Sequence, residues 1–326
     1  MSLLEVKNLR VEFPTRRGTL LAIDDISFSI EPGEVLGVVG ESGAGKSLTG
    51  ASIIGLLEPP GRVADGKITL EGERIDDLPY EKMRHVRGKK IGAIFQDPLT
   101  SLNPLYTVSK QLTETILVHM DMSQEQARKR AVELLDEVGI PAAETRIDSY
   151  PHEFSGGMRQ RVVIALALCA NPKLIVADEP TTALDVSIQA QIIAIIKRLC
   201  KEHKTAVMLI THDMGVIAET ADRVAVMYAG RIVEIGEVRD IIKDAKHPYT
   251  KGLMGSIPVV GHDVEVLQQI DGSMPRLNEV PKGCAFNSRC PDAINKCFVD
   301  RPDLMQTDGL SAAACWLYSK EAVNEG

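Results

Sequence analysis

One run of residues near the start of the chain has the types and spacing needed to bind the phosphates of a nucleotide. Residues 40–47 have the form G-x-x-x-x-G-K-S. They follow an apolar stretch, 34–39, and precede a helix-like stretch, 48–57, which is the context that this motif requires. Glycines let backbone N–H groups turn toward the phosphates, and the N-terminus of the next helix favours the same negative charge. The sequence therefore predicts a phosphate-binding loop, in which Lys46 faces the terminal phosphates and Ser47 coordinates Mg²⁺.

Two neighbouring acids follow another apolar run, 173–177. Asp178 can complete the shell of Mg²⁺ while Glu179 faces an attacking water. A purely structural role is the weaker alternative, because a buried carboxylate is costly without a cation. His212 follows the next apolar run, and it could contact a γ-phosphate, although a single histidine at such a place is more often a core residue. These residues together predict hydrolysis of a bound nucleoside triphosphate.

Four cysteines in the last part of the chain have the spacing C-x5-C-x6-C-x17-C. They are Cys284, Cys290, Cys297 and Cys315, and a proline follows the second. Zinc sites usually contain short C-x2–4-C pairs, which this segment lacks. Iron–sulfur clusters tolerate longer loops and often have a cysteine followed by proline. The spacing predicts a metal site and leaves cluster and zinc open; Cys169 and Cys200 are interpreted as core residues.

The elements that position these residues alternate between strands and helices. Residues 3–13 and 19–30 alternate apolar and polar side chains, which indicates a hairpin. The short apolar runs before the phosphate loop, before Asp178 and before His212 indicate buried strands of an open α/β sheet, whose ligands collect at the carboxyl ends of the strands. Phe13, which ends the first strand of the hairpin, could stack on a base or could simply be an edge-strand aromatic.

The remaining stretches indicate an insertion and a tail. From about residue 105 the pattern is helical, and Ser123 and Gln126 form a capping box that opens a helix ending near Gly139. This predicts an inserted helical subdomain, about 105–160. After Gly236, prolines, glycines and four of the six cysteines accumulate, which predicts a small second domain. The expected domains are residues 1–236 and 237–326.

Composition limits the class of protein. The chain has 326 residues, of which 44% are hydrophobic and 25% charged, with a net charge of -8 and a pI near 5.5. These values indicate an ordinary globular protein and argue against a general nucleic-acid binder. No signal peptide is evident, and no apolar run approaches the roughly 20 residues needed to span a bilayer. We expect a cytosolic chain, so that other chains must supply any membrane component.

Taken in order, these motifs resemble the series found in ATPase subunits of ABC transporters, over residues 1–236. The resemblance implies a P-loop α/β core with an antiparallel β subdomain and an inserted helical subdomain. The motif-bearing segments are the phosphate loop, Gln96, residues 155–160, residues 174–179, Ala183-Leu184-Asp185 and His212. The ATP contacts that it implies are Phe13, Gly40, Ser42, Gly43, Ala44, Gly45, Lys46, Ser47 and Leu48.

The resemblance also implies a role for each catalytic residue. Glu179 matches the catalytic base, His212 the histidine that holds the γ-phosphate, and Gln96 the glutamine that links the Mg²⁺ site to the transmembrane partner. Asp185 matches a loop that crosses to the opposite subunit. Mg²⁺ would be held by Ser47, Gln96 and Asp178.

Residues 155–160 match the family's signature motif, although Phe154 and Met158 depart from its commonest form. Ser155 is expected to cap a helix, while Gly156 and Gly157 let the nucleotide of another chain approach its first turn. In the family this motif lies far from the phosphate loop of its own subunit. The resemblance therefore implies that two cassettes pair head to tail with ATP between them.

Residues 150–154, residues 247–250 and the cysteine-bearing tail resemble the dipeptide and oligopeptide permease subfamily. That resemblance implies a peripheral subunit on the cytoplasmic face of the inner membrane, which powers peptide import with two permease chains, a peptide-binding protein and often a paralogous ATPase. It also favours a [4Fe–4S] cluster over zinc, for stapling the tail or for redox control. Importers of nickel or other small solutes are similar in sequence and remain an alternative.

A soluble cassette ATPase of translation or DNA repair is a rival from a different class. Cassette ATPases of translation usually have two cassettes in one chain, and those of DNA repair have a long coiled-coil insertion. This chain has one phosphate loop and an insertion of only some fifty residues. No nucleic-acid partner is expected.

Overall fold

The computed structural model describes residues 2–182, 184–256, 269–307, 309 and 311–319. The chain divides into two compact units, each assembled from separate segments. The first unit contains residues 1–4, 30–35 and 70–210. The second contains residues 5–29, 36–69 and 211–326.

Three parallel strands form the sheet of the first unit, in the order β8-β7-β6. They are β6 (Ile91–Ile94), β7 (Leu174–Asp178) and β8 (Ala206–Ile210). Every residue of β8 and the first four of β7 are buried. A parallel strand covered on both faces needs apolar side chains at successive positions, which explains the uninterrupted apolar runs in the sequence. The predicted strands before Asp178 and His212 are confirmed.

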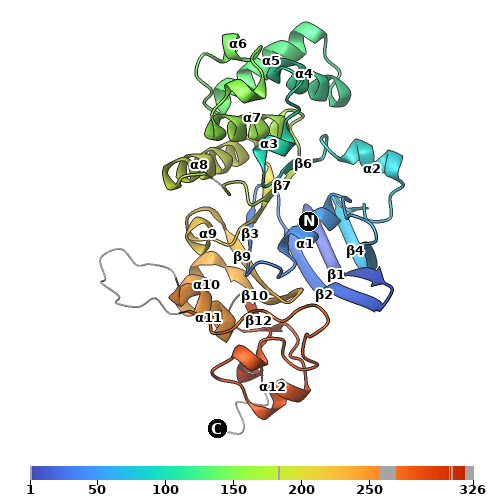
Figure 1. Cartoon of the computed structure of the whole chain (residues 1–326), viewed down its shortest axis with the longest axis vertical. Coiled ribbons are helices and arrows are strands. Elements are labelled where there is room, and N and C mark those ends of the chain that lie inside the picture. Colours follow the sequence, from blue (N-terminus) through green and yellow to red (C-terminus); the bar gives the residue numbers. More distant parts are fainter. Residues whose placement is uncertain (1, 183, 257–268, 308, 310, 320–326) are drawn as a thin grey trace. The chain divides into compact units, whose positions relative to one another are not determined.

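Helices of the first unit form a bundle that corresponds to the predicted insertion (Figure 1). Its members are α3 (Pro98–Ser101), α4 (Val108–His119), α5 (Gln124–Glu137), α6 (Ala143–Arg146) and α7 (Gly156–Leu168), with the 3₁₀ turn η1 (Pro151–Glu153) before α7. The capping box of α5 is present, since Gln126 N–H donates to Ser123 Oγ at 3.2 Å and Ser123 N–H to Gln126 Oε1 at 2.8 Å. The apolar faces of α4 and α5 pack together, as expected for amphipathic helices. The unit also contains β5 (Glu73–Arg74), α2 (Tyr80–Val86) and α8 (Val186–His203).

The second unit contains the predicted hairpin. Its strands β1 (Leu4–Thr15) and β2 (Gly18–Ile30) belong to one sheet with β4 (Arg62–Leu70), in the order β2-β1-β4. Both strands are slightly longer than the alternating pattern indicates, and the turn between them is correspondingly shorter. Phe13 therefore lies within β1 rather than at its end.

A second sheet of this unit has the strand order β11-β12-β10-β9-β3. Strand β3 (Val35–Val39) is parallel to β9 (Arg223–Tyr228), and β9 is antiparallel to β10 (Arg231–Glu237). Two short strands from the tail, β11 (Met305–Gln306) and β12 (Ala312–Ala313), continue this sheet, with Glu234 opposite Ala313. The helices of the unit are α1 (Lys46–Ile53), α9 (Met214–Thr220), α10 (Val238–Asp244), α11 (Pro248–Gly255) and α12 (Asn295–Val299), with the 3₁₀ turns η2 (Asn287–Arg289) and η3 (Trp316–Tyr318).

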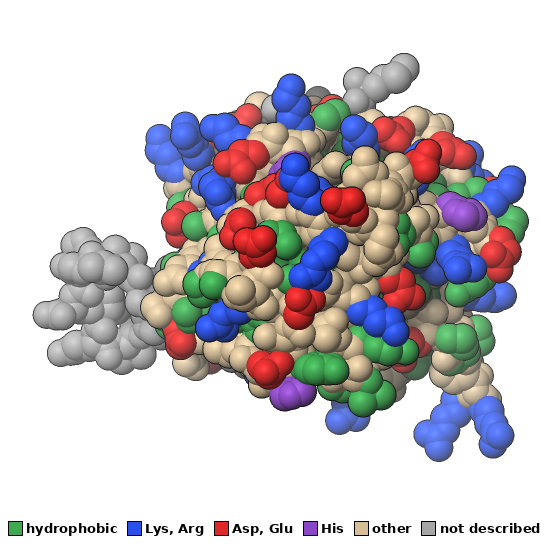
Figure 2. Space-filling model, turned by 90° about the horizontal axis from the view of Figure 1, so that it is seen from above, with side chains coloured by type: hydrophobic (Ala, Val, Ile, Leu, Met, Phe, Trp, Pro, Cys, Tyr) green, Lys and Arg blue, Asp and Glu red, His purple; other side chains and the backbone are tan. Residues whose placement is uncertain are grey.

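Two surface properties bear on partners. Among the helices in the described residues, none is long and apolar enough to cross a membrane. On the face shown in Figure 2, the described basic and acidic side chains are intermixed and form no extended patch of one sign.

Candidate functional site

The phosphate loop, residues 40–47, leaves β3 and enters α1 in the second unit. Gly40 and Gly45 have φ of 151° and 102°, which is the left-handed region that favours glycine. A Cβ at Gly40 would collide with the carbonyl oxygen of Met227, and one at Gly45 would lie 2.6 Å from Ile23 Cδ1. The loop thus needs glycine for its dihedral angles, as the motif predicted, and the structure shows that it also needs glycine for close packing.

Lys46 places a positive charge inside this loop. Its side chain is buried, and its Nζ donates to the carbonyl oxygens of Gly40 at 2.8 Å and Glu41 at 3.0 Å. A buried ammonium held by backbone carbonyls is well placed to neutralise phosphate oxygens. Ser47 is exposed in the first turn of α1, where its hydroxyl can reach a ligand. The loop therefore fits a nucleoside triphosphate with its Mg²⁺.

The two acids lie at the carboxyl end of β7 in the first unit. Glu179 Oε2 accepts hydrogen bonds from Gln96 Nε2 and from Thr182 Oγ1, both at 2.9 Å. Its N–H donates to the carbonyl of Ile210, at the end of the neighbouring strand, at 2.9 Å. The structure thus brings together Gln96 and Glu179, which are far apart in sequence. Sequence reasoning missed Thr182, whose only signal is its place three residues after the acid.

Glu179 also has an uncommon backbone conformation. Its φ is 47°, in the left-handed region, which costs a residue with a side chain about 1 to 3 kcal/mol. Because β7 and β8 hold the residue through the Ile210 contact, the surrounding sheet compensates for this cost. Strain at the carboxyl end of a strand is characteristic of functional positions.

His212 follows β8 and belongs to the second unit, as does the phosphate loop. The N–H of Thr211 donates to the carbonyl of Val38 in β3 at 3.1 Å, which places the segment beside the strand that leads into the loop. Asp213 caps α9 by accepting from Gly215 N–H at 2.8 Å. His212 is therefore presented on a fixed turn, with its side chain exposed.

The signature residues form the N-terminus of α7 in the first unit. Ser155 is the N-cap, and its Oγ accepts from Met158 N–H at 3.4 Å, as the sequence predicted. A Cβ at Gly157 would lie 2.8 Å from Ile188 Cγ2, whereas among the described residues one at Gly156 would meet only Leu184, at 3.8 Å. Packing within the chain therefore requires glycine at 157 and leaves room at 156.

Asp185 caps α8. Its Oδ1 accepts from Ser187 Oγ at 2.7 Å and from Ile188 N–H at 3.0 Å. These hydrogen bonds, that of Ser187 first, lower the pKa of Asp185. Ala183, which precedes this segment in the predicted motif, lies outside the described residues. Phe13 lies against Gly61, where an added Cβ would be 2.7 Å from its ring.

The four tail cysteines lie in the second unit, where Cys284 N–H donates to the Cys297 carbonyl at 2.8 Å. Burial raises the pKa of the Cys284 thiol to about 11, and the neighbouring Cys297 and Cys290 add to this effect. Burial likewise raises the pKa of Cys315 to about 11, with contributions from the other three. Within the described part of the chain, however, no group of three or more His, Cys, Asp or Glu side chains is arranged to hold a metal ion. The side chains as they stand do not support the predicted metal site.

The other two cysteines agree with their interpretation as core residues. Cys169 and Cys200 are both buried, and burial raises the pKa of each to about 12. A thiol that stays protonated at neutral pH is a poor nucleophile and a poor metal ligand.

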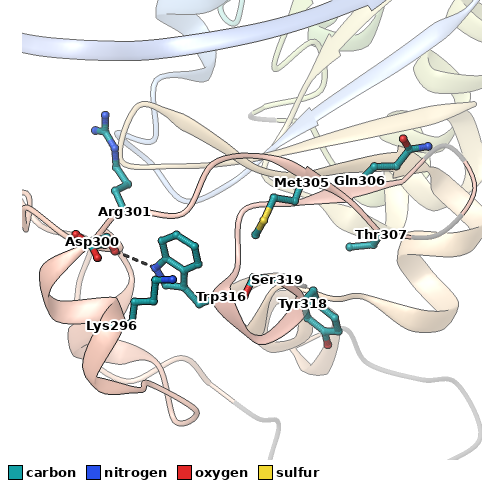
Figure 3. A pocket seen from close by; sticks show the side chains of 9 residues that line it. All are labelled: Lys296, Asp300, Arg301, Met305, Gln306, Thr307, Trp316, Tyr318 and Ser319. Atoms are coloured by element: carbon teal, nitrogen blue, oxygen red, sulfur yellow. Dashed lines mark hydrogen bonds between the residues drawn. The ribbon is translucent and has the colours of Figure 1, made fainter. Parts of the chain in front are cut away.

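A hollow of about 1050 Å³ lies among the tail residues (Figure 3). Trp316 donates from its indole N–H to the Asp300 carbonyl at 2.9 Å, and Lys296 lies 4.0 Å from the centre of its ring. The hollow is lined by Lys296, Asp300, Arg301, Met305, Gln306, Thr307, Trp316, Tyr318 and Ser319. None of the predicted site residues lines this hollow, so it is separate from the nucleotide chemistry.

Comparison with known proteins finds a matching family model for each of two parts of the sequence. A family model described as "ABC transporter" matches residues 23–182, and one described as "Oligopeptide/dipeptide transporter, C-terminal region" matches residues 233–297. Among solved structures, the dimeric ATP-binding cassette MJ0796 bound to ADP and Pi is similar, with a TM-score of 0.65 and 29% identity. That match covers 72% of this chain and 99% of the other.

Curated relatives match along nearly the whole chain. The oligopeptide transport ATP-binding protein AppD of Bacillus subtilis (strain 168) is 46% identical over 99% of both chains. The dipeptide transport ATP-binding protein DppD of the same organism is 48% identical, over 98% of this chain and 96% of the relative. DppD of Escherichia coli (strain K12) is 45% identical over 95% of both. With its cassette fold and phosphate loop, the chain belongs to the family of ATP-binding proteins of ABC transporters, within the oligopeptide and dipeptide group.

Proposed function

We propose that this chain binds and hydrolyses MgATP as one half of a cassette pair that drives the import of di- or oligopeptides through a channel formed by other proteins. The observation that carries the proposal is the phosphate loop, with a buried Lys46 held against its own carbonyls. The names of the full-length relatives supply the class of solute.

In the proposed reaction, Lys46 neutralises the terminal phosphates and Glu179 polarises the attacking water. Gln96 and Thr182 orient the carboxylate of Glu179 by donating to the same oxygen, Oε2. His212 holds the γ-phosphate. Bound Mg²⁺, held by Ser47, Gln96 and Asp178, would offset charge on the phosphate oxygens. Phe13 would stack on the adenine.

The signature segment provides the other half of the proposed composite site. Ser155, Gly156 and Gly157 would face the triphosphate held by the loop of a second cassette, and Asp185 would cross to that subunit. Support comes from Gly156, since packing within this chain leaves space for a larger residue there. Glycine at this position is then explained by the approach of a nucleotide from outside the chain.

The proposed assembly contains two permease subunits, a peptide-binding protein and a paralogous second ATPase, with this chain peripheral on the cytoplasmic face of the inner membrane. Within it, residues 1–236 act as the nucleotide-binding domain, and residues 237–326 form a peptide-permease-type tail. The match of a C-terminal family model from residue 233 supports this division. No nucleic-acid partner is proposed.

A cluster in the tail is a separate proposal. Cys284, Cys290, Cys297 and Cys315 would bind [4Fe–4S], or Zn²⁺ as the alternative. The spacing of four cysteines in one short tail, with a proline after the second, supports it, whereas the described side chains as they stand form no ready metal site. Iron, acid-labile sulfide and zinc should be measured on the purified chain, with EPR on Cys290→Ser and on Cys200→Ser as a buried control. Absence of all three from anaerobically purified protein would remove the proposal.

Transport is tested by reconstituting the assembled complex in liposomes and measuring ATP-dependent uptake of labelled di- and oligopeptides. We expect Lys46→Ala to abolish uptake and Lys243→Ala, an exposed lysine of the same unit, to preserve it. Uptake of Ni²⁺ in place of peptide would favour the small-solute alternative. Continued peptide uptake by Lys46→Ala would contradict the proposed energy source.

A further inference from the structure

A glutamate within the phosphate loop is held at both its main chain and its side chain by residues from the tail. The N–H of Glu41 donates to Tyr249 Oη at 2.8 Å. Its two carboxylate oxygens accept from Arg289 Nη1 at 2.9 and 3.1 Å. Neither tail residue belongs to the nucleotide-binding motifs, and Arg289 lies 248 positions along the chain from Glu41.

Arg289 is itself fixed by several hydrogen bonds. Its side chain is only 6% exposed, and its Nε donates to the carbonyl of Asp271 at 2.8 Å. Its Nη2 lies 3.3 Å from the carbonyl oxygens of Ile270 and Gly272. Only the planar guanidinium, with five N–H groups, can make this set of contacts at once. The arginine is therefore held in one position relative to the loop.

An aromatic cluster packs against the two tail residues, Tyr249 and Arg289, that contact Glu41. The ring centroids of Tyr228 and Tyr249 are 4.7 Å apart, and Phe286 lies 5.3 and 5.4 Å from them. The guanidinium of Arg289 lies 5.8 Å from the Tyr228 and Phe286 rings. Tyr228, Tyr249 and Phe286 are almost fully buried. The cluster thus joins β9, α11 and the segment before η2 into one packed support.

The charge of Glu41 makes this support relevant to nucleotide binding. A phosphate loop must accept several negative charges, and a free carboxylate in the loop would repel them. Pairing with Arg289 neutralises that carboxylate and holds it to one side. It also fixes the loop before the nucleotide arrives, which lowers the entropy lost on binding.

We propose that Arg289 is a positioning residue for ATP binding, which acts by neutralising and holding Glu41 of the phosphate loop. The tail of the chain thereby sets the affinity of the nucleotide site. The inference rests on ATP binding by residues 40–47.

The test measures MgATP affinity of the full-length chain by isothermal titration calorimetry, for Arg289→Met, Glu41→Gln and the double variant. Arg301→Met is the matched control, because Arg301 is another tail arginine that forms an ion pair, with Asp24 of the same unit. Arg289→Lys is included so that a charged variant remains available if Arg289→Met does not fold. Thermal melting without nucleotide reports the stability of each variant.

We expect Arg289→Met to bind MgATP about tenfold more weakly, because the unpaired carboxylate then faces the phosphates. The double variant and Arg301→Met should remain within about twofold of the wild type, since neither leaves a free carboxylate in the loop. Glu41→Gln leaves the Arg289 cation beside the loop and should bind MgATP at least as tightly as the wild type. Arg289→Lys should lie between the wild type and Arg289→Met. The difference between Arg289→Met and the wild type should shrink at high salt, which screens charge but not packing.

Wild-type affinity in Arg289→Met would overturn the proposal. Equal weakening in Arg289→Met and in the double variant would also overturn it, because a purely structural role predicts no rescue by Glu41→Gln. Failure of the wild-type chain to bind MgATP would instead contradict the phosphate-loop assignment. Lys46→Ala should not bind MgATP measurably. It shows what loss of the phosphate loop itself looks like, for comparison with the partial loss expected for Arg289→Met.

Discussion

The phosphate loop and the acid pair at the end of β7 are built in different ways. The loop depends on backbone geometry, with glycines at positive φ and a lysine directed at carbonyl oxygens, and the tail buttresses it through Tyr249 and Arg289. The acid pair depends on side chains, since Glu179 has a strained backbone and a carboxylate oriented by two donors. Apart from Lys46, the loop presents backbone groups to the phosphates, whereas the reactive site acts through side chains. Variants of the two regions, of the tail that supports the loop and of the signature segment test this contrast, from the largest expected effect to the smallest.

Glu179→Gln should show the largest difference between turnover, which depends on the acid pair, and MgATP affinity, which depends on the loop. The amide keeps the shape of the side chain but cannot accept a proton, so we expect turnover to fall by about 10²- to 10⁴-fold. MgATP affinity should stay within about twofold, because the loop is intact. Single-turnover hydrolysis and calorimetry measure the two quantities, and size exclusion with ATP should show a trapped pair of cassettes. Full turnover in this variant would contradict the role of Glu179.

Acidification should destabilise the tail residues that contact the phosphate loop. Burial lowers the pKa of His247 to about 4, and its Nδ1 accepts from Tyr249 N–H at 3.1 Å. Because His247 stays neutral in the folded protein, the free energy of unfolding falls as the pH falls from the unfolded pKa of about 6.5 toward 4. At pH 4 this loss reaches about 3 kcal/mol. His247→Asn, which keeps an acceptor, should show a flatter decline in the free energy of unfolding.

Denaturant unfolding at several pH values compares the wild type with His247→Asn directly. The nearby Glu234, whose pKa is raised by burial, is unchanged in both proteins, and its contribution cancels in the difference. Parallel curves for the two proteins would show that His247 does not titrate in this range.

The two signature glycines should differ in stability. Gly157→Ala brings a methyl group within 2.8 Å of Ile188 and should cost about 1 to 3 kcal/mol of unfolding free energy. Gly156→Ala meets no described residue closer than 3.8 Å and should be nearly neutral for folding, yet should reduce ATPase activity of the assembled pair. Chemical denaturation and ATPase assays on both variants check this. An equal loss of stability would show that the two positions are packed alike.

Thr182→Val should have the smallest effect. It removes one of two donors to Glu179 Oε2 and leaves Gln96 in place. Loss of one such hydrogen bond is worth about 1 kcal/mol, so we expect turnover to fall about fivefold. Thr182→Ser, which keeps the hydroxyl, is the matched control and should retain activity. A larger loss than that of Glu179→Gln would show that the hydroxyl matters more to turnover than the carboxylate it orients.

The sequence was most informative where a local pattern carries the structure. The capping box at Ser123, the apolar run of β8 and the glycines of the phosphate loop each follow from a few neighbouring residues. The grouping of Gln96 with Glu179 came from the order of family motifs rather than from spacing. Local patterns could therefore place the elements but not their long-range partners.

What the sequence did not reveal depends on contacts between distant segments. Neither the pairing of Arg289 with Glu41 nor the hydrogen bond of Thr182 has a periodic signal. The tail strand β12 has only two residues, too few for an alternating pattern to appear. Left-handed backbone at Glu179 was also unexpected, since the sheet that imposes it is built from segments far apart in sequence.

The ion pair between positions 41 and 289 has a consequence for how such chains can diverge. A recombination that exchanged only the tail with that of another transporter would separate Glu41 from the Arg289 that pairs with it. The head and tail of this chain should therefore be inherited together, and chimaeras in which positions 41 and 289 do not match should bind MgATP more weakly.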